Sequence, residues 1–128
     1  MPSKESFYPD DWLRIADRDL ARVQLLLDSD DPEAAGFYLQ QALEKYLKAF
    51  LLARGWSLRR THDLEALLND ALEYQTSLEP FRPLCQKATG FYFFERYPFA
   101  TAAGLTLEDV TSSLREAKKM IAQLKQKA

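Results

Sequence analysis

The stretch that decides the fold is PEAAGFYLQQALEKYLKAFLLARG, residues 32–55. Pro32 and Glu33 suit the first turn of a helix, and Gly55 suits the position just after a last turn. Between them, apolar residues cover more than half of the helical circumference: Ala35, Tyr38, Leu39, Ala42, Leu43, Tyr46, Ala49, Phe50 and Ala53. A helix that is apolar on most sides is usually central in a bundle, in contact with several neighbours or with a partner chain. The stretch therefore predicts a central helix that ends near Arg54.

Amphipathic stretches on both sides of this helix predict four further helices. Each has apolar residues at three- and four-residue spacing, and together they span residues 9–27, 62–74, 82–94 and 107–124. Thr61 and Thr106 are the expected N-caps of the second and fourth of these. No segment shows the alternation typical of a strand. The sequence thus predicts one all-α domain over residues 1–128, an antiparallel up-and-down bundle of four to five helices.

Composition excludes several classes of protein. With 128 residues and 47% hydrophobic residues, the chain suits one compact globular domain rather than a disordered segment. No apolar run approaches the roughly 20 residues that span a bilayer, and the first ten residues lack the apolar core of a signal peptide. One histidine and one cysteine cannot form the usual zinc site or a disulfide within the chain. We expect a cytoplasmic protein without metal or cofactor.

The overall charge gives little indication of a ligand. A formal net charge of −2 does not favour general binding of nucleic acid or anionic membranes, although a local basic groove remains compatible with it. The function must therefore be sought in local groups of residues.

One such group lies on the predicted central helix, in the segment QQALEKYLK, residues 40–48. Glu44 and Lys48 are four residues apart and can pair, while Gln41, Lys45 and Lys48 share one stripe. The simplest interpretation is a solvated face with ordinary ion pairs. The alternative is a basic stripe that meets a ligand.

Two further groups contain residues that could carry chemistry. His62, the only histidine, begins the third predicted helix, where a structural role is commoner than a catalytic one. The segment FYFFERYPF, residues 91–99, places Arg96 among aromatic rings. Arginine in such a setting can stack on rings and bind a phosphate bidentately, or it can simply pair with a carboxylate at the edge of an aromatic core. The sequence leaves both alternatives open.

Together these segments resemble the HEPN family (higher eukaryotes and prokaryotes nucleotide-binding) over nearly the whole chain. The resemblance rests on four pieces in the right order: the opening helix WLRIADRDL, residues 12–20; YLQQALEKYLKA, residues 38–49; His62-Asp63-Leu64; and Arg96-Tyr97-Pro98. It implies a four- to five-helix bundle that commonly forms homodimers. It also implies a frequent association with a minimal nucleotidyltransferase protein, often in toxin–antitoxin pairs.

The sequence departs from the ribonucleases of this family in one respect. Those members use an arginine followed after four to six residues by a histidine, which combine phosphate binding with proton transfer. After Arg96 the corresponding positions are Thr101, Ala102 and Ala103, and no other arginine has His62 at the required spacing. The sequence therefore argues against the standard RNA cleavage of the family.

The resulting hypothesis is a non-catalytic HEPN module that binds a nucleotide or a protein partner. The resemblance implies a ligand or partner surface that involves Lys45, Lys48, His62, Arg96 and Tyr97. A second hypothesis is a metal-independent ribonuclease toxin with a displaced site, in which His62 approaches Arg96 in space. A third is a structural dimer that regulates a nucleotidyltransferase.

Overall fold

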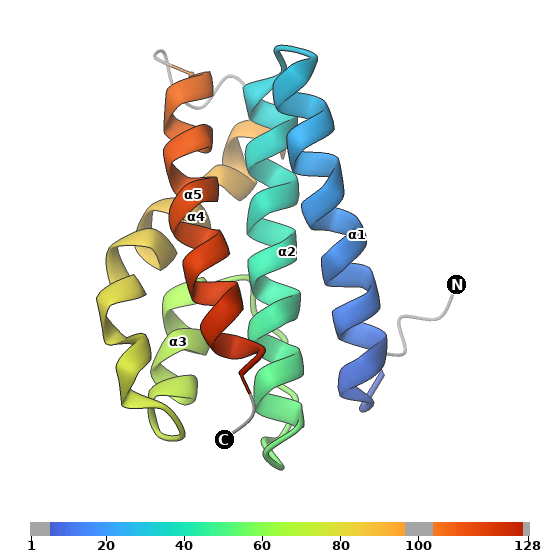
Figure 1. Ribbon diagram of the computed structural model, residues 1–128, viewed down its shortest axis with the longest axis vertical. Helices are drawn as coiled ribbons and strands as arrows, with labels where there is room; N and C mark the ends of the chain where they lie inside the picture. Colours follow the sequence, from blue (N-terminus) through green and yellow to red (C-terminus); the bar gives the residue numbers. More distant parts are fainter. Residues whose placement is uncertain (1–5, 97–103, 127–128) are drawn as a thin grey trace.

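The computed structural model describes residues 6–96 and 104–126, except for the side chains of residues 93–96. Within these ranges the chain forms five α-helices and one 3₁₀ helix, and it forms no strand. Their order is α1 (Pro9–Asp28), α2 (Pro32–Leu52), α3 (Leu64–Leu72), η1 (Thr76–Phe81), α4 (Arg82–Arg96) and α5 (Leu107–Leu124). The longer helices α1, α2, α4 and α5 alternate in direction along the bundle (Figure 1). The all-α antiparallel architecture expected from the sequence is confirmed.

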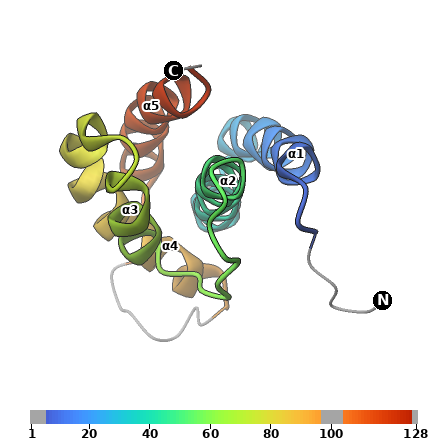
Figure 2. The ribbon, with the colours of Figure 1, turned by 90° about the horizontal axis from the view of Figure 1, so that it is seen from below.

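Helix α2 is the centre of the molecule. Figure 2 shows α1 on one side of α2 and the helices α3, α4 and α5 around the other side. Its apolar residues are almost completely buried, which explains why they cover most of the helical circumference: Leu39, Ala42, Leu43, Leu47 and Leu51 are each 0% exposed. Contacts with all four other α-helices thus bury most of the apolar surface of α2 within the chain.

The helix starts follow the signals in the sequence, with one shift. Asp31 caps α2 by accepting a hydrogen bond from the Ala34 amide, and Thr106 forms a capping box with Asp109 at the start of α5. At α3, however, the N-cap is Asp63 rather than the expected Thr61. The Asp63 carboxylate accepts hydrogen bonds from two amides of the first turn, so His62 stays outside the helix.

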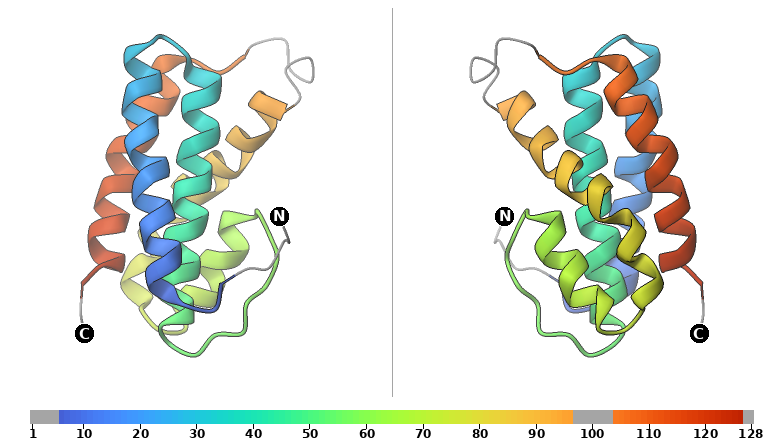
Figure 3. Two further views of the ribbon diagram at one scale, coloured as in Figure 1. Left: turned by 90° about the vertical axis from the view of Figure 1, so that its right-hand side faces the viewer. Right: turned by 90° about the vertical axis from the view of Figure 1, so that its left-hand side faces the viewer.

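Helix α4 begins where the prolines allow. Pro80 is accommodated in η1, and Pro83 lies in the first turn of α4, where no intrahelical donor is needed. The helix then runs obliquely past α2 (Figure 3). Close approach of these helices depends on Gly36, since a Cβ atom there would lie 3.3 Å from the Phe91 side chain.

None of the helices in the described part of the chain is long and apolar enough to cross a bilayer.

Candidate functional site

The polar residues of α2 form a buried network rather than a solvated face. Gln40 is 0% exposed, and the side chains of Glu44 and Lys48 are only 6% and 2% exposed. The simplest interpretation of the segment QQALEKYLK, an exposed face with ordinary ion pairs, is therefore wrong for these three residues. Packing alone does not account for a charged pair at this place in the core. Two apolar side chains of the same size would fill the space without the cost of desolvating two charges.

The centre of the network is the Glu44 carboxylate. Lys48 Nζ donates to Glu44 Oε2 at 2.9 Å, and Gln40 Nε2 donates to Glu44 Oε1 at 3.3 Å. His62 Nδ1 lies 2.8 Å from the same Oε1 atom. Gln40 Nε2 also donates to the His62 carbonyl at 2.9 Å, so both the backbone and the ring of His62 are held by α2.

The indole of Trp12 closes the inner end of this network. Lys48 Nζ lies 5.3 Å from the centroid of the Trp12 ring, within the range of a cation–π interaction. Trp12 comes from α1 and is itself 7% exposed, with its Nε1 donating to the Ser6 carbonyl at 2.7 Å. Lys48 is consequently sealed between α1 and α2 and faces Glu44 rather than solvent.

A second part of the network reaches α1. Lys45 Nζ donates to Asp19 Oδ2 at 2.6 Å and to Gln41 Oε1 at 3.2 Å, and Gln41 Nε2 donates to Gln40 Oε1 at 2.7 Å. We call Asp19, Lys45, Gln41, Gln40 and Glu44 the polar chain. It crosses α2 from α1 to His62, so that hydrogen bonds link the Lys45 ammonium to the His62 imidazole.

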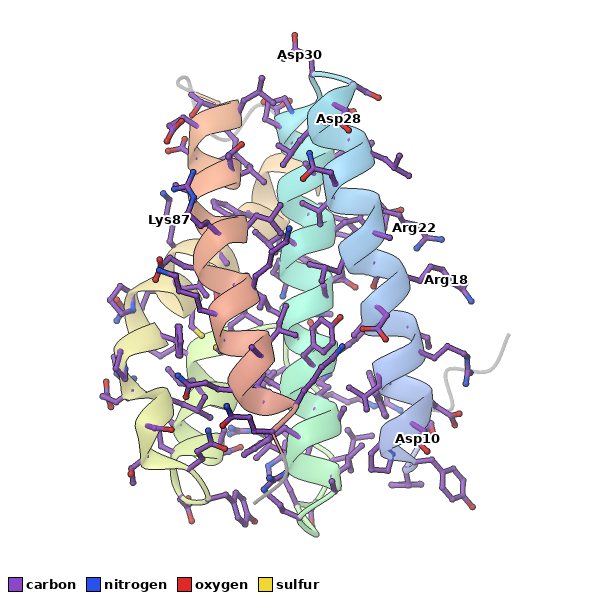
Figure 4. All side chains as sticks on the ribbon, in the orientation of Figure 1. Asp10, Arg18, Arg22, Asp28, Asp30 and Lys87 are labelled. Carbon is purple, nitrogen blue, oxygen red and sulfur yellow. The ribbon has the colours of Figure 1, made fainter. Side chains whose placement is uncertain are left out.

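Cationic side chains of α1 lie beside the Asp19 end of the polar chain. Arg22 donates to Asp19 Oδ1 at 2.8 Å, and its guanidinium lies 5.3 Å from the centroid of the Tyr38 ring. Figure 4 shows Arg18 and Arg22 extending from the same flank of α1. The Arg22 side chain is 42% exposed, whereas that of Lys45 is 17% exposed. Positive charge is thus offered to solvent mainly by α1.

Aromatic rings of α2 and α4 lie beside the His62 end of the polar chain. His62 stacks on Tyr92 with ring centroids 4.8 Å apart and planes inclined by 21°. Tyr92 in turn lies 5.7 Å from Phe37, and Phe37 lies 5.4 Å from Tyr38. The His62 side chain remains 58% exposed. The imidazole is therefore fixed on two sides yet open to a ligand.

The residues expected from the sequence divide into three groups. The structure links Lys45 and His62 through the polar chain, and it buries Lys48 beside Glu44. Arg96 is the last residue of α4, four residues after Tyr92, but its side chain and the whole of Tyr97 lie outside the described residues. Sequence reasoning missed Asp19 and gave no individual role to Gln40 or Tyr92, since their roles depend on contacts between distant segments.

A separate groove lies between α1, α2 and α5. It has a volume of about 760 Å³ and is lined mainly by apolar side chains, including Leu13, Phe50 and Leu124. Asp17 borders it, with its carboxylate accepting hydrogen bonds from the Tyr46 hydroxyl and from Lys125 Nζ, the latter at 3.2 Å. These hydrogen bonds lower the pKa of Asp17 even though burial alone would raise it. The groove contains none of the residues of the polar chain.

The fold and the site define a class of protein: a small helical bundle whose central helix holds a buried polar network beneath one exposed histidine. Residues 9–127 match the family model of the HEPN domain, so the chain belongs to the HEPN domain family. No curated protein matches the chain significantly.

Two solved structures are similar over almost the whole chain. The crystal structure of TT1696 from Thermus thermophilus has a TM-score of 0.81 and 31% sequence identity, covering 91% of this chain and 94% of that one. The structure of ST0689, described as an archaeal HEPN homologue, has a TM-score of 0.73 and 24% identity, covering 92% and 95%. The second similarity shows the shared fold alone.

Proposed function

We propose that the surface around His62 binds a nucleotide and that the chain acts as a binding module rather than as a standard HEPN ribonuclease. The observation that carries the proposal is the state of His62: its ring is held by the buried Glu44 carboxylate, stacked on Tyr92 and 58% exposed. Burying the Glu44 and Lys48 charges beneath His62 costs free energy of desolvation. A requirement to present the ring to a ligand explains that cost.

Each part of the surface suits one part of a nucleotide. Lys45 and Arg22 supply positive charge for a phosphate, with Asp19 holding both side chains in place. The exposed His62 ring, backed by Tyr92, and the Tyr38 ring supply aromatic surface against which a base can stack. Arg96 and Tyr97, which follow Tyr92 in the sequence, are included in the proposed site on the strength of the family resemblance alone. Lys48 has a supporting role, because it neutralises Glu44 from inside the bundle.

Titration calorimetry with ribonucleoside monophosphates and diphosphates tests this proposal. We expect binding by the wild-type protein and weaker binding by the Lys45→Ala, His62→Ala and Arg96→Ala variants. Lys87→Ala is the matched control, because Lys87 projects from the opposite flank of the bundle (Figure 4). Equal affinity in all five proteins, or no binding in any, contradicts the proposal.

A second candidate function is RNA cleavage by a displaced site. The observation in its favour is that His62 stacks on Tyr92, which lies one helical turn before Arg96 on α4. Imidazole and guanidinium are the two groups that the family's cleavage chemistry requires. This candidate predicts metal-independent cleavage of RNA by the purified protein, loss of cleavage in His62→Ala and Arg96→Ala, and growth arrest on expression. An inactive and harmless wild-type protein excludes it.

We further propose that the chain forms a homodimer or binds a minimal nucleotidyltransferase, as members of the family commonly do, within a toxin–antitoxin-type pair. The apolar groove between α1, α2 and α5 supports this, because its volume of about 760 Å³ could receive apolar side chains of a partner. Light scattering tests the dimer, and co-purification tests the enzyme partner. A monomer that retains no nucleotidyltransferase contradicts this proposal without affecting nucleotide binding.

A further inference from the structure

The hydrogen bonds that Glu44 can form determine which ring nitrogen of His62 carries a proton. Glu44 Oε1 accepts a hydrogen bond from Gln40 Nε2 and lies within hydrogen-bond distance of His62 Nδ1. Glu44 Oε2 accepts a hydrogen bond from Lys48 Nζ. A lysine ammonium can only donate hydrogen bonds, and an amide nitrogen can only donate as well. Two of the three partners of Glu44 are therefore obligatory donors, as expected around a carboxylate that is ionised.

The burial of the pair strengthens this assignment. The Lys48 and Glu44 side chains are 2% and 6% exposed, and the Trp12 ring covers the ammonium. A buried ammonium with no anion beside it would be strongly disfavoured, so Lys48 holds Glu44 in its ionised form. An ionised carboxylate accepts hydrogen bonds and donates none.

It follows that the His62–Glu44 contact has one direction. Nδ1 must carry the proton and donate it to Glu44, because the carboxylate has none to donate. In a neutral imidazole only one ring nitrogen is protonated, so Nε2 then carries a lone pair and acts as an acceptor. Stacking on Tyr92 fixes the plane in which this acceptor lies.

We infer that Glu44 is a positioning residue that fixes His62 as a hydrogen-bond acceptor, and that the group His62 accepts from is the ribose 2′-hydroxyl of the ligand. This inference rests on the proposed function and narrows its ligand to ribonucleotides. A phosphate group, which offers acceptor oxygens, does not suit a neutral Nε2 acceptor, whereas the 2′-hydroxyl can donate to it. The amino groups of the base could also donate, but the base is assigned to the aromatic rings. The phosphate belongs instead with the donors Lys45 and Arg22.

The tautomer can be measured without any ligand. Nitrogen chemical shifts of the only imidazole side chain, recorded at pH 8, distinguish a proton on Nδ1 from a proton on Nε2. We expect the Nδ1–H form in the wild-type protein. Because either single substitution leaves a buried charge alone, the test variant replaces both partners, Glu44→Met with Lys48→Met. In this variant the ring should lose its preference for Nδ1–H, while Glu116→Gln, at an exposed pair with Lys119, should leave it unchanged.

The ligand class is measured by calorimetry with the four ribonucleoside monophosphates and their 2′-deoxy counterparts. Loss of one hydrogen bond to the ligand should weaken binding of the deoxy form by roughly five- to tenfold in the wild-type protein. The double variant should bind both forms with similar affinity, whereas Glu116→Gln should keep the ribose preference.

The outcomes separate this inference from the proposed function. Binding with equal affinity for the ribose and deoxyribose forms, or an Nε2–H tautomer in the wild-type protein, overturns the inference and leaves nucleotide binding intact. Absence of binding to any of the eight nucleotides overturns both. A ribose preference that persists unchanged in the double variant overturns the role of Glu44.

Discussion

Glu44 Oε1 lies 2.8 Å from His62 Nδ1, and this contact joins the interior of the bundle to its candidate binding surface. One partner is buried and charged, and the other is more than half exposed. The two residues lie 18 positions apart, on a helix and on the connection that follows it. Through this contact the buried Glu44–Lys48 ion pair holds an exposed side chain. The contribution of the pair to stability can be measured by substitution.

The Glu44–Lys48 pair should show strong coupling in stability. Lys48→Met alone leaves a buried carboxylate without its cation and should lower the free energy of unfolding by ~3–5 kcal/mol. Replacing both residues by methionine removes both buried charges and should cost much less than the sum of the single substitutions. Urea denaturation of the two single variants and the double variant measures this coupling. Additive losses would show that the pair is not energetically linked.

The two glycines of α2 and α4 should respond in opposite ways to alanine. At Gly36 a new Cβ would lie 2.6 Å from Leu105 Cδ2 and 3.3 Å from Phe91, so Gly36→Ala should destabilise the protein by ~1–3 kcal/mol through overpacking. At Gly90 nothing lies within 4 Å, and Gly90→Ala should stabilise α4 by ~0.5–1 kcal/mol. Thermal unfolding compares the two. A neutral Gly36→Ala would contradict the close approach of α2 to α4 and to Leu105.

The Tyr46–Asp17 hydrogen bond should make stability fall at alkaline pH. Burial and the carboxylate of Asp17 raise the pKa of Tyr46 above its usual range. The folded protein therefore keeps the phenol proton, while the unfolded chain loses it as pH rises past about 10, so the unfolded state becomes relatively more favourable. Tyr46→Phe should flatten this alkaline fall, as measured by urea denaturation between pH 8 and pH 11. An identical pH profile in the variant would rule out this contribution.

Cys85 should be unreactive in the folded protein. It is 0% exposed, and burial raises the pKa of its thiol to about 12, so very little thiolate forms near neutral pH. Alkylation by iodoacetamide at pH 8 should be slow in buffer and fast in denaturing urea. Rapid labelling of the native protein would show that the α4 packing around Cys85 opens readily.

The sequence predicted the fold better than the site, for a physical reason. Helix positions depend on local signals, and Pro9, Pro32 and Thr106 mark helix starts in the structure as they do in the sequence. The central place of α2 also followed from its own composition. The start of α3 differed, because Asp63 and not Thr61 caps it, and α2 and α3 end at Leu52 and Leu72, two residues earlier than expected.

The polar network could not be predicted in this way. Whether Lys48 meets solvent or Glu44 depends on Trp12, 36 positions earlier in the chain, and spacing along one helix contains no such information. The stacking of His62 on Tyr92 likewise needs the packing of α4. The resemblance to the HEPN family identified Lys45 and His62 as candidates, but only the structure relates them to Glu44 and Tyr92.

The most direct test of the central claim is to map nucleotide binding onto the protein by NMR. Titration of the labelled protein with a ribonucleoside monophosphate should shift the backbone amide signals of Lys45, His62 and Tyr92 and the imidazole signals of His62. Signals of Leu13, Phe50 and Leu124, in the groove between α1, α2 and α5, should stay unchanged. Shifts confined to that groove, or no shifts at all, would contradict the account.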